Sequence, residues 1–101
     1  MKTDKYIFKS QKPDITEILR RVTEAVQVLG TPCTARAVAR HLGATDKKGE
    51  VLPSIYIALE LLALKQHGAV SSAAFERLTQ GLSLNALSQL AHTLREHQQK
   101  L

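Results

Sequence analysis

Apolar residues recur at helical spacing along most of this chain. Over residues 14–29 they return every three or four positions and form one face of a helix, while charged residues occupy the other face. Further apolar segments occupy residues 35–42, 53–67 and 84–100, and Gly, Pro, Ser or Thr stands at most of the segment ends. We therefore predict a mainly α fold of about five helices.

The segment 53–67 is apolar around most of its circumference. A narrow stripe of polar or small positions runs along it, made of Tyr56, Glu60, Ala63 and His67. A helix of this kind is covered on nearly all sides, either at the centre of the domain or in the seam of an oligomer. We expect Leu42, Leu59 and Leu62 to be buried, so that truncating any of them to Ala costs about 2–5 kcal/mol.

Two structures are open for residues 72–80, SAAFERLTQ. A strand would place Phe75 and Leu78 on opposite faces, whereas a helix brings them to one face together with Ala74. The segment begins at a Ser, stops at Gly81 and is rich in helix-forming residues. We favour the helix.

Residues 1–12 are predicted to be a basic N-terminal arm. Lysines surround a short apolar run in it: Lys2, Lys5, Lys9 and Lys12 around Tyr6, Ile7 and Phe8. This run is interpreted as a short strand or as an anchor on the core, in an arm that is otherwise flexible. Residues 13–101 are expected to form a single helical domain that ends in the helix 84–100.

The chain is basic, with a formal net charge of +5 and a pI of about 9.7. Residues 1–50 carry ten Lys or Arg against six Asp or Glu, whereas residues 51–101 carry four against three. This balance favours binding to a polyanion, usually DNA or RNA, through the first half of the chain. The alternative is that the excess charge serves solubility only.

The sequence carries no signature of an enzyme, a cofactor site or a metal site. The single cysteine, Cys33, excludes a disulfide framework within the chain. His92 and His97 stand five residues apart, so they are not an i,i+4 pair on one helix face, and no phosphate-binding glycine loop or nucleophile motif occurs. No apolar run has the length of a membrane span, and the N-terminus lacks the apolar core of a signal peptide. We predict a cytoplasmic protein that is not an enzyme and does not bind a membrane.

Two short patterns flank a long apolar helix within residues 34–70. Ala39, Leu42 and Gly43 form A-x-x-L-G, and Gly68 and Val70 form x-x-G-x-V. This order resembles the helix-turn-helix of bacterial winged-helix regulators, in which the first pattern ends the supporting helix and the second ends the recognition helix. The resemblance covers the middle third of the chain and implies a DNA-binding regulator. A helix over residues 72–80 would take the place of the wing.

The resemblance assigns DNA contacts to this middle region. The candidates are Ser54 and Tyr56 for base edges, and Arg36, Arg40, Lys47 and Lys48 for phosphates. The first two turns of helix 53–67 hold no Arg, Asn or Gln, the residues that make paired contacts with bases. We therefore expect most of the affinity for double-stranded DNA to come from phosphate contacts and to fall steeply with salt.

The last helix carries an apolar ridge with a spacing of three and four. Its members are Leu84, Leu87, Ala91 and Leu94. The ridge is interpreted in two ways, as packing on the domain's own core or as the dimerisation surface of a homodimer. The predicted function is a small, dimeric DNA-binding regulator. The alternative is a helical protein-interaction or adaptor domain without DNA binding, which would dock a protein partner through this ridge and the helix 53–67.

Overall fold

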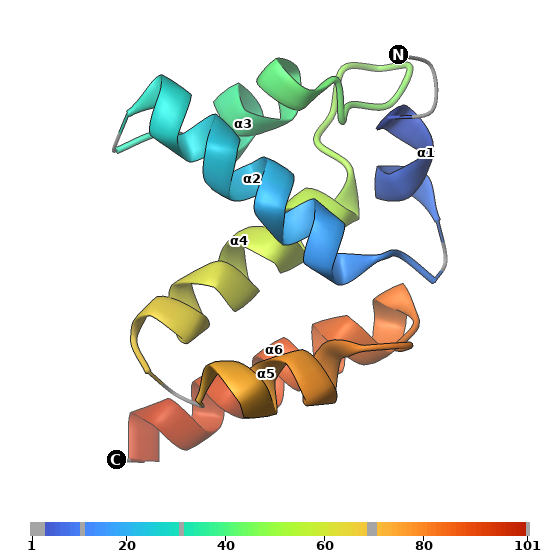
Figure 1. Ribbon diagram of the computed structural model, residues 1–101. Coiled ribbons are helices and arrows are strands. Elements are labelled where there is room, and N and C mark those ends of the chain that lie inside the picture. Colours follow the sequence, from blue (N-terminus) through green and yellow to red (C-terminus); the bar gives the residue numbers. More distant parts are fainter. Residues whose placement is uncertain (1–3, 11, 31, 69–70, 101) are drawn as a thin grey trace.

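A computed structural model of the protein shows six helices and no strands over the residues that it describes (Figure 1). These are residues 4–10, 12–30, 32–68 and 71–100. The helices are α1 (Asp4–Lys9), α2 (Ile15–Leu29), α3 (Ala35–Leu42), α4 (Pro53–Gln66), α5 (Ser72–Thr79) and α6 (Leu84–Lys100). The predicted mainly α fold is confirmed, with one helix more than expected, at the N-terminus. None of the described helices has the length and apolar character needed to cross a bilayer.

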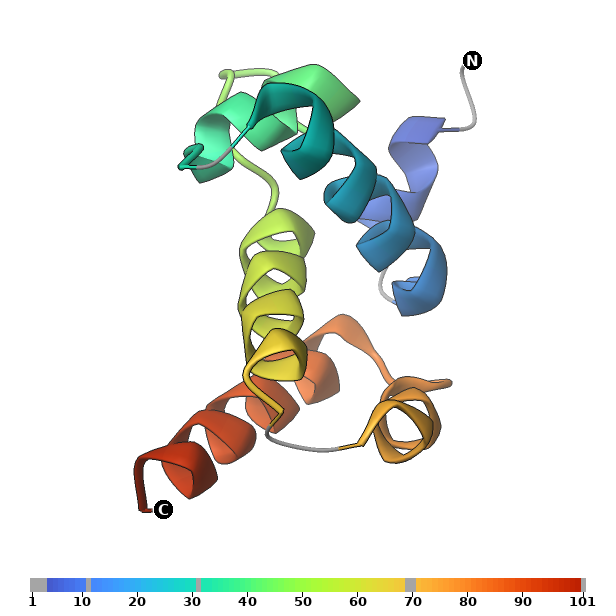
Figure 2. The same cartoon turned by 60° about the vertical axis from the view of Figure 1, so that its left-hand side comes forward.

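The helix α4 joins two groups of helices. In Figures 1 and 2, α1, α2 and α3 surround its N-terminal half, and α5 and α6 lie around its C-terminal half. α2 packs against both α3 and α4, while α6 packs along α4 from the other end. The core is therefore continuous through α4, and the basic segments around α3 lie at the opposite end of the molecule from α6.

One stripe of α4 faces the core. The three leucines that we expected to be buried lie at the edge of the core instead. The buried residues of α4 are Ser54, Ile55, Ala58, Leu61 and Leu64. Leu42, Leu59 and Leu62 are only half-buried and pack against the edge of the core. The prediction of full burial is wrong for these three residues. For Leu59 and Leu62 the reason is that a helix apolar on nearly all sides does not reveal its inward direction, because several rotations about its axis bury equal numbers of leucines. Leu42 is the last residue of α3.

The narrow polar or small stripe of α4 does turn away from the core. Tyr56 is 57% exposed, and Ala63 and His67 are exposed as well. Glu60 is half-buried because it forms an ion pair with Arg95 of α6. This pair ties the outer edge of α4 to α6.

The apolar run near the N-terminus forms part of a helix. Of the two interpretations, a strand is wrong and an anchor is confirmed, because α1 is helical and Phe8 is 1% exposed. Ser54 Oγ of α4 donates a hydrogen bond of 2.7 Å to the backbone oxygen of Phe8. α1 is therefore fastened to the start of α4 by one aromatic side chain and one buried hydrogen bond.

The ambiguous segment after α4 is a helix, as favoured. Ser71 caps α5 by accepting a hydrogen bond from the backbone N–H of Ala74 at 3.2 Å. Phe75 and Thr79 are buried one turn apart, and Thr79 Oγ1 donates to the backbone oxygen of Phe75 at 2.9 Å. A helix thus stands where a winged-helix protein has its wing. Val70, at the end of the second pattern, lies outside the described residues.

The apolar ridge of α6 is used within the chain. Leu87 and Ala91 are fully buried, Leu94 is 7% exposed and Leu84 is half-buried. They pack on the core that α4 forms, so this ridge is not a free dimerisation surface. The interpretation as core packing is therefore correct for Leu87, Ala91 and Leu94. A spacing of three and four shows that a ridge is covered but does not show which chain covers it.

Candidate nucleic-acid interface

Both ends of α3 are defined by local hydrogen bonds. Thr34 Oγ1 accepts a hydrogen bond of 3.0 Å from the backbone N–H of Ala37 and so caps the first turn. At the other end Gly43 has a φ of 70°, the left-handed conformation in which a side chain is disfavoured. The chain then turns back so that the N–H of Ala44 donates to the carbonyl of Ala39 at 2.8 Å. These caps hold a two-turn helix that would be marginal alone.

Arg36 and Arg40 lie one turn apart on the outer side of α3, and both are exposed. The inner side is held by Val38 and Ala39, which are fully buried. Residues 32–45 contain no Asp or Glu, so no acidic side chain of this segment offsets the two guanidinium groups. α3 therefore presents two positive charges from a rigid support.

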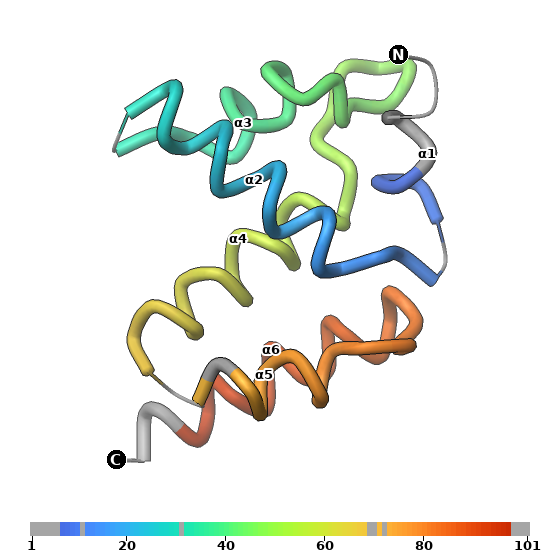
Figure 3. The backbone as a smooth tube through the Cα atoms, in the orientation of Figure 1, coloured from blue at the N-terminus to red at the C-terminus, as the bar shows by residue number. Residues whose placement is uncertain are grey.

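The connection from α3 to α4 is a bridged turn rather than an open loop. Figure 3 follows the chain from α3 through residues 43–52 into α4. Thr45 and Val51 form an antiparallel bridge, and the N–H of Leu52 donates to the carbonyl of Ala44 at 3.1 Å. Ala44 is fully buried and fixes the base of this turn in the core.

Lys47 and Lys48 occupy the tip of this turn. The N–H of Gly49 donates to the carbonyl of Asp46 at 3.0 Å, which makes Lys47 and Lys48 the central residues of a β-turn. The Asp46 carboxylate accepts hydrogen bonds from the backbone N–H groups of Lys48 (2.8 Å) and Glu50 (2.9 Å). Asp46 therefore organises the backbone. The sequence indicates this turn through an Asp at its first position and a Gly at its fourth, a signal that the sequence analysis did not use.

The cations of α3 and of this turn have no carboxylate partner within the part of the chain that the structure describes. Among the described residues, Arg36, Arg40, Lys47 and Lys48 form no ion pair. Asp46 and Glu50 of the same turn are exposed and offset two of the four charges. We call these four cations, on α3 and on the bridged turn of residues 44–52, the basic end.

The arginines of α2 are arranged differently. Arg20 pairs with Glu17 and, at 2.6 Å, with Glu24, while Arg21 Nε lies 2.9 Å from the Glu17 carboxylate. The hydrogen bond from Arg20 holds the pKa of Glu17 below its ordinary value. The charged face of α2 is thus internally neutralised, which leaves the basic end as the stronger attractor for an anion.

The start of α4 does not present a reading surface. Ser54, a predicted contact to bases, is 1% exposed and uses its hydroxyl on Phe8 of α1. This prediction is wrong, because the unforeseen helix α1 covers that side of α4. Tyr56 remains exposed and is the one predicted base contact that solvent reaches.

Two lysines of the predicted basic arm, Lys9 and Lys12, have described side chains. Lys9 ends α1 and is exposed, as is Lys12, which follows it. Lys5 lies within α1, and Lys2 lies outside the described residues. No three His, Cys, Asp or Glu side chains of the described chain gather as the ligands of a metal ion would. Cys33 is half-buried and has no disulfide partner.

Comparison of the chain with protein-family models, with characterised proteins and with solved structures finds no match.

Proposed function

We propose that the protein binds double-stranded DNA through the sugar–phosphate backbone, with the basic end as the contact surface. The observation that carries this proposal is the set of four exposed cations, on two consecutive and locally braced elements, that have no carboxylate partner among the described residues. Phosphate contacts need positive charge on a defined support and no particular base sequence.

Rigid support lowers the entropic cost of binding. Arg36 and Arg40 project from a helix with both ends capped, and Lys47 and Lys48 project from a turn closed by its own backbone and by Asp46. The backbone under these side chains is ordered before the nucleic acid arrives, so binding does not carry the additional entropic cost of ordering a loop.

Base reading is not part of this proposal. Ser54 is buried, and the exposed stripe of α4 offers Tyr56 and a half-buried Glu60, which phosphate would repel. Binding is therefore expected to be sequence-independent. A regulatory role would follow only if a second element supplied the specificity.

A matched set of charge variants tests the proposal. Each phosphate contact releases about 0.9 counterion, which corresponds to a roughly eightfold gain in affinity at about 0.1 M salt. Replacing both members of either pair, as R36Q/R40Q or K47Q/K48Q, should weaken duplex binding by roughly fifty-fold. The control K65Q/R77Q removes the same charge from α4 and α5 and should change the affinity about twofold or less.

Fluorescence anisotropy of a labelled duplex gives these affinities directly. Equal losses in all three variants would mean that only net charge matters, and the basic end would then not be the site. No binding by the native protein at low salt would end the proposal.

The alternative function, a protein-interaction or adaptor domain, has less support than DNA binding, because much of the apolar surface that suggested it is buried within the chain. The inward stripe of α4 and Leu87, Ala91 and Leu94 of α6 are buried within the chain, and Leu59, Leu62 and Leu84 are half-buried. The large apolar side chains that are exposed in the described structure are Val28, Leu29, Tyr56 and Leu78. They come from three different helices, and scattered side chains of this kind are common on monomeric proteins.

A further inference from the structure

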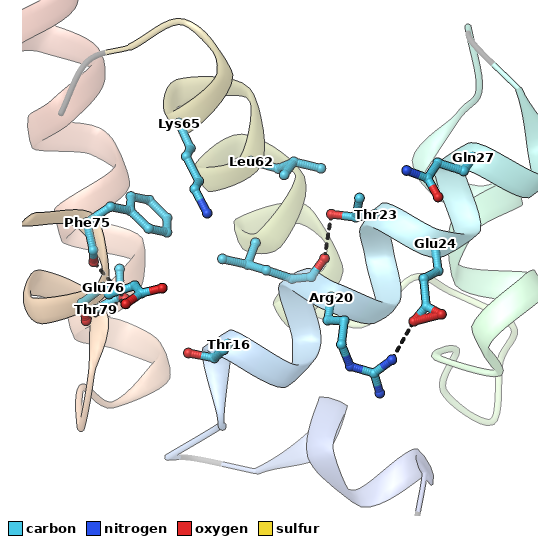
Figure 4. A pocket seen from close by; sticks show the side chains of 11 residues that line it. Thr16, Arg20, Thr23, Glu24, Gln27, Leu62, Lys65, Phe75, Glu76 and Thr79 are labelled. Atoms are coloured by element: carbon cyan, nitrogen blue, oxygen red, sulfur yellow. Dashed lines mark hydrogen bonds and ion pairs between the residues drawn. The ribbon is translucent and has the colours of Figure 1, made fainter. Parts of the chain in front are cut away.

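A groove lies between α2, α4 and α5, away from the basic end. Its volume is about 430 Å³, which lies in the range of about 300–1,000 Å³ typical of small-molecule sites. Leu19 of α2, Leu62 of α4 and Phe75 of α5 form its apolar floor. Figure 4 shows these three helices around the groove, with polar side chains of α2 and α5 along its edges.

Lys65 supplies a positive charge inside this groove. Its side chain extends from α4 towards α2, and its ammonium lies 5.4 Å from the centre of the Phe75 ring (Figure 4). It forms no ion pair among the described residues and is half-buried. An ammonium beside an aromatic ring and an apolar floor is less hydrated than one in open solvent, so it gains more from an arriving anion.

The other polar groups of the groove neither bind an anion as well as Lys65 nor repel it strongly. Arg20 is held by Glu17 and Glu24, and the hydroxyl of Thr23 donates to the backbone oxygen of Leu19 at 2.7 Å. Glu76 is exposed on α5, where solvent screens its charge. Lys65 is therefore the strongest available partner for a negative group.

From this arrangement we infer a second binding site, which takes a small amphipathic anion: an apolar body with one carboxylate or sulfonate. The apolar body of this ligand contacts the floor formed by Leu19, Leu62 and Phe75, and its anionic group contacts the Lys65 ammonium. The occupant is a small molecule because the volume is too small for a helix with its side chains.

Two related fluorescent probes test this site on the intact protein. Anilinonaphthalenesulfonate carries an apolar body and one anionic group, and phenylnaphthylamine has the same rings without the charge. The chain contains no Trp, so probe emission is read without interference. We expect the sulfonate to bind at one site per chain and more tightly than the neutral probe.

Variants on both sides of the groove give opposite expected results. K65Q should weaken the sulfonate about two- to fivefold, the range for one partly exposed ion pair, and leave the neutral probe unchanged. E76Q should strengthen the sulfonate, because it removes a negative charge from the edge. K65R should restore binding, and the exposed Arg77 gives the control R77Q, which should change nothing.

The inference is overturned if the natively folded protein, shown by cooperative unfolding, binds neither probe. It is also overturned if K65Q leaves sulfonate binding unchanged, or if R77Q weakens it as much as K65Q does. Duplex binding should stay unaltered in K65Q, so this site and the basic end can fail separately.

Discussion

Truncating Leu87 to Ala measures how much of the fold depends on packing of α6 within one chain. Leu87 is fully buried between α6 and the core around α4. Removing most of a fully buried leucine side chain costs about 2–5 kcal/mol, through lost burial and the cavity left behind. For a chain of 101 residues, each kilocalorie lowers the melting temperature by roughly 4–8 °C. This one substitution should therefore consume a large part of a typical domain's stability.

Urea unfolding followed by far-ultraviolet circular dichroism measures this loss, at two protein concentrations that differ widely. The midpoint should be the same at both concentrations, because Leu87 is buried against its own chain. The matched control is Leu78→Ala on α5, where the side chain is 45% exposed. It should change stability by about 0.5 kcal/mol or less.

Two results would refute this reasoning. A loss below about 1 kcal/mol for Leu87→Ala would mean that the side chain does not pack as described. A midpoint that rises with protein concentration would mean that α6 packs between chains, which restores the dimerisation surface expected from its leucine spacing.

Three further substitutions test local features. Ser54→Ala removes the buried hydrogen bond to Phe8 and should cost about 1–3 kcal/mol in unfolding free energy, without changing duplex affinity, since the Ser54 side chain is buried. Gly43→Ala forces a side chain into a φ of 70° and should destabilise the protein by about 1–2 kcal/mol in the same assay. Glu17 has a lowered pKa because of Arg20, so this pair stabilises the fold above the carboxylate's ordinary pKa of 4.5, and the stabilisation is lost as the pH falls through the lowered value. Glu17→Gln should therefore flatten the fall of unfolding free energy at acid pH and leave its slope near neutrality unchanged.

The boundaries of α2 to α6 could be predicted because they are encoded locally. Thr34 and Ser83 each accept a hydrogen bond from a backbone N–H three residues ahead, and Gly43 takes the left-handed conformation that ends α3. Such signals lie within a few residues of the boundary that they define. They need no knowledge of the tertiary structure.

The sequence could not show which segment packs over each face of a helix, because that segment is distant in the sequence. Ser54 follows Pro53 at a helix start and so looks available to a ligand, but α1 folds over it. The run around Phe8 is too short for its periodicity to identify a helix. Leu87 belongs to a ridge that would suit a partner chain and the protein's own core equally well.

The four cations of the basic end could be identified from the sequence, but the backbone structure that presents them could not. The helix-turn-helix resemblance, together with their charge, points to Arg36, Arg40, Lys47 and Lys48. The bridged turn that presents the two lysines depends on Asp46, whose carboxylate bonds to backbone rather than to a cation. The groove beside Lys65 had no signal in the sequence, since it arises only from the placing of three helices.

The salt dependence of duplex binding tests the basic end most directly. The slope of log K against log salt concentration should be about 2 units shallower for R36Q/R40Q than for the native protein, and equally so for K47Q/K48Q, because each variant loses two phosphate contacts. The control K65Q/R77Q should keep the native slope. Parallel slopes for all four proteins would contradict the assignment of phosphate contacts to α3 and the bridged turn.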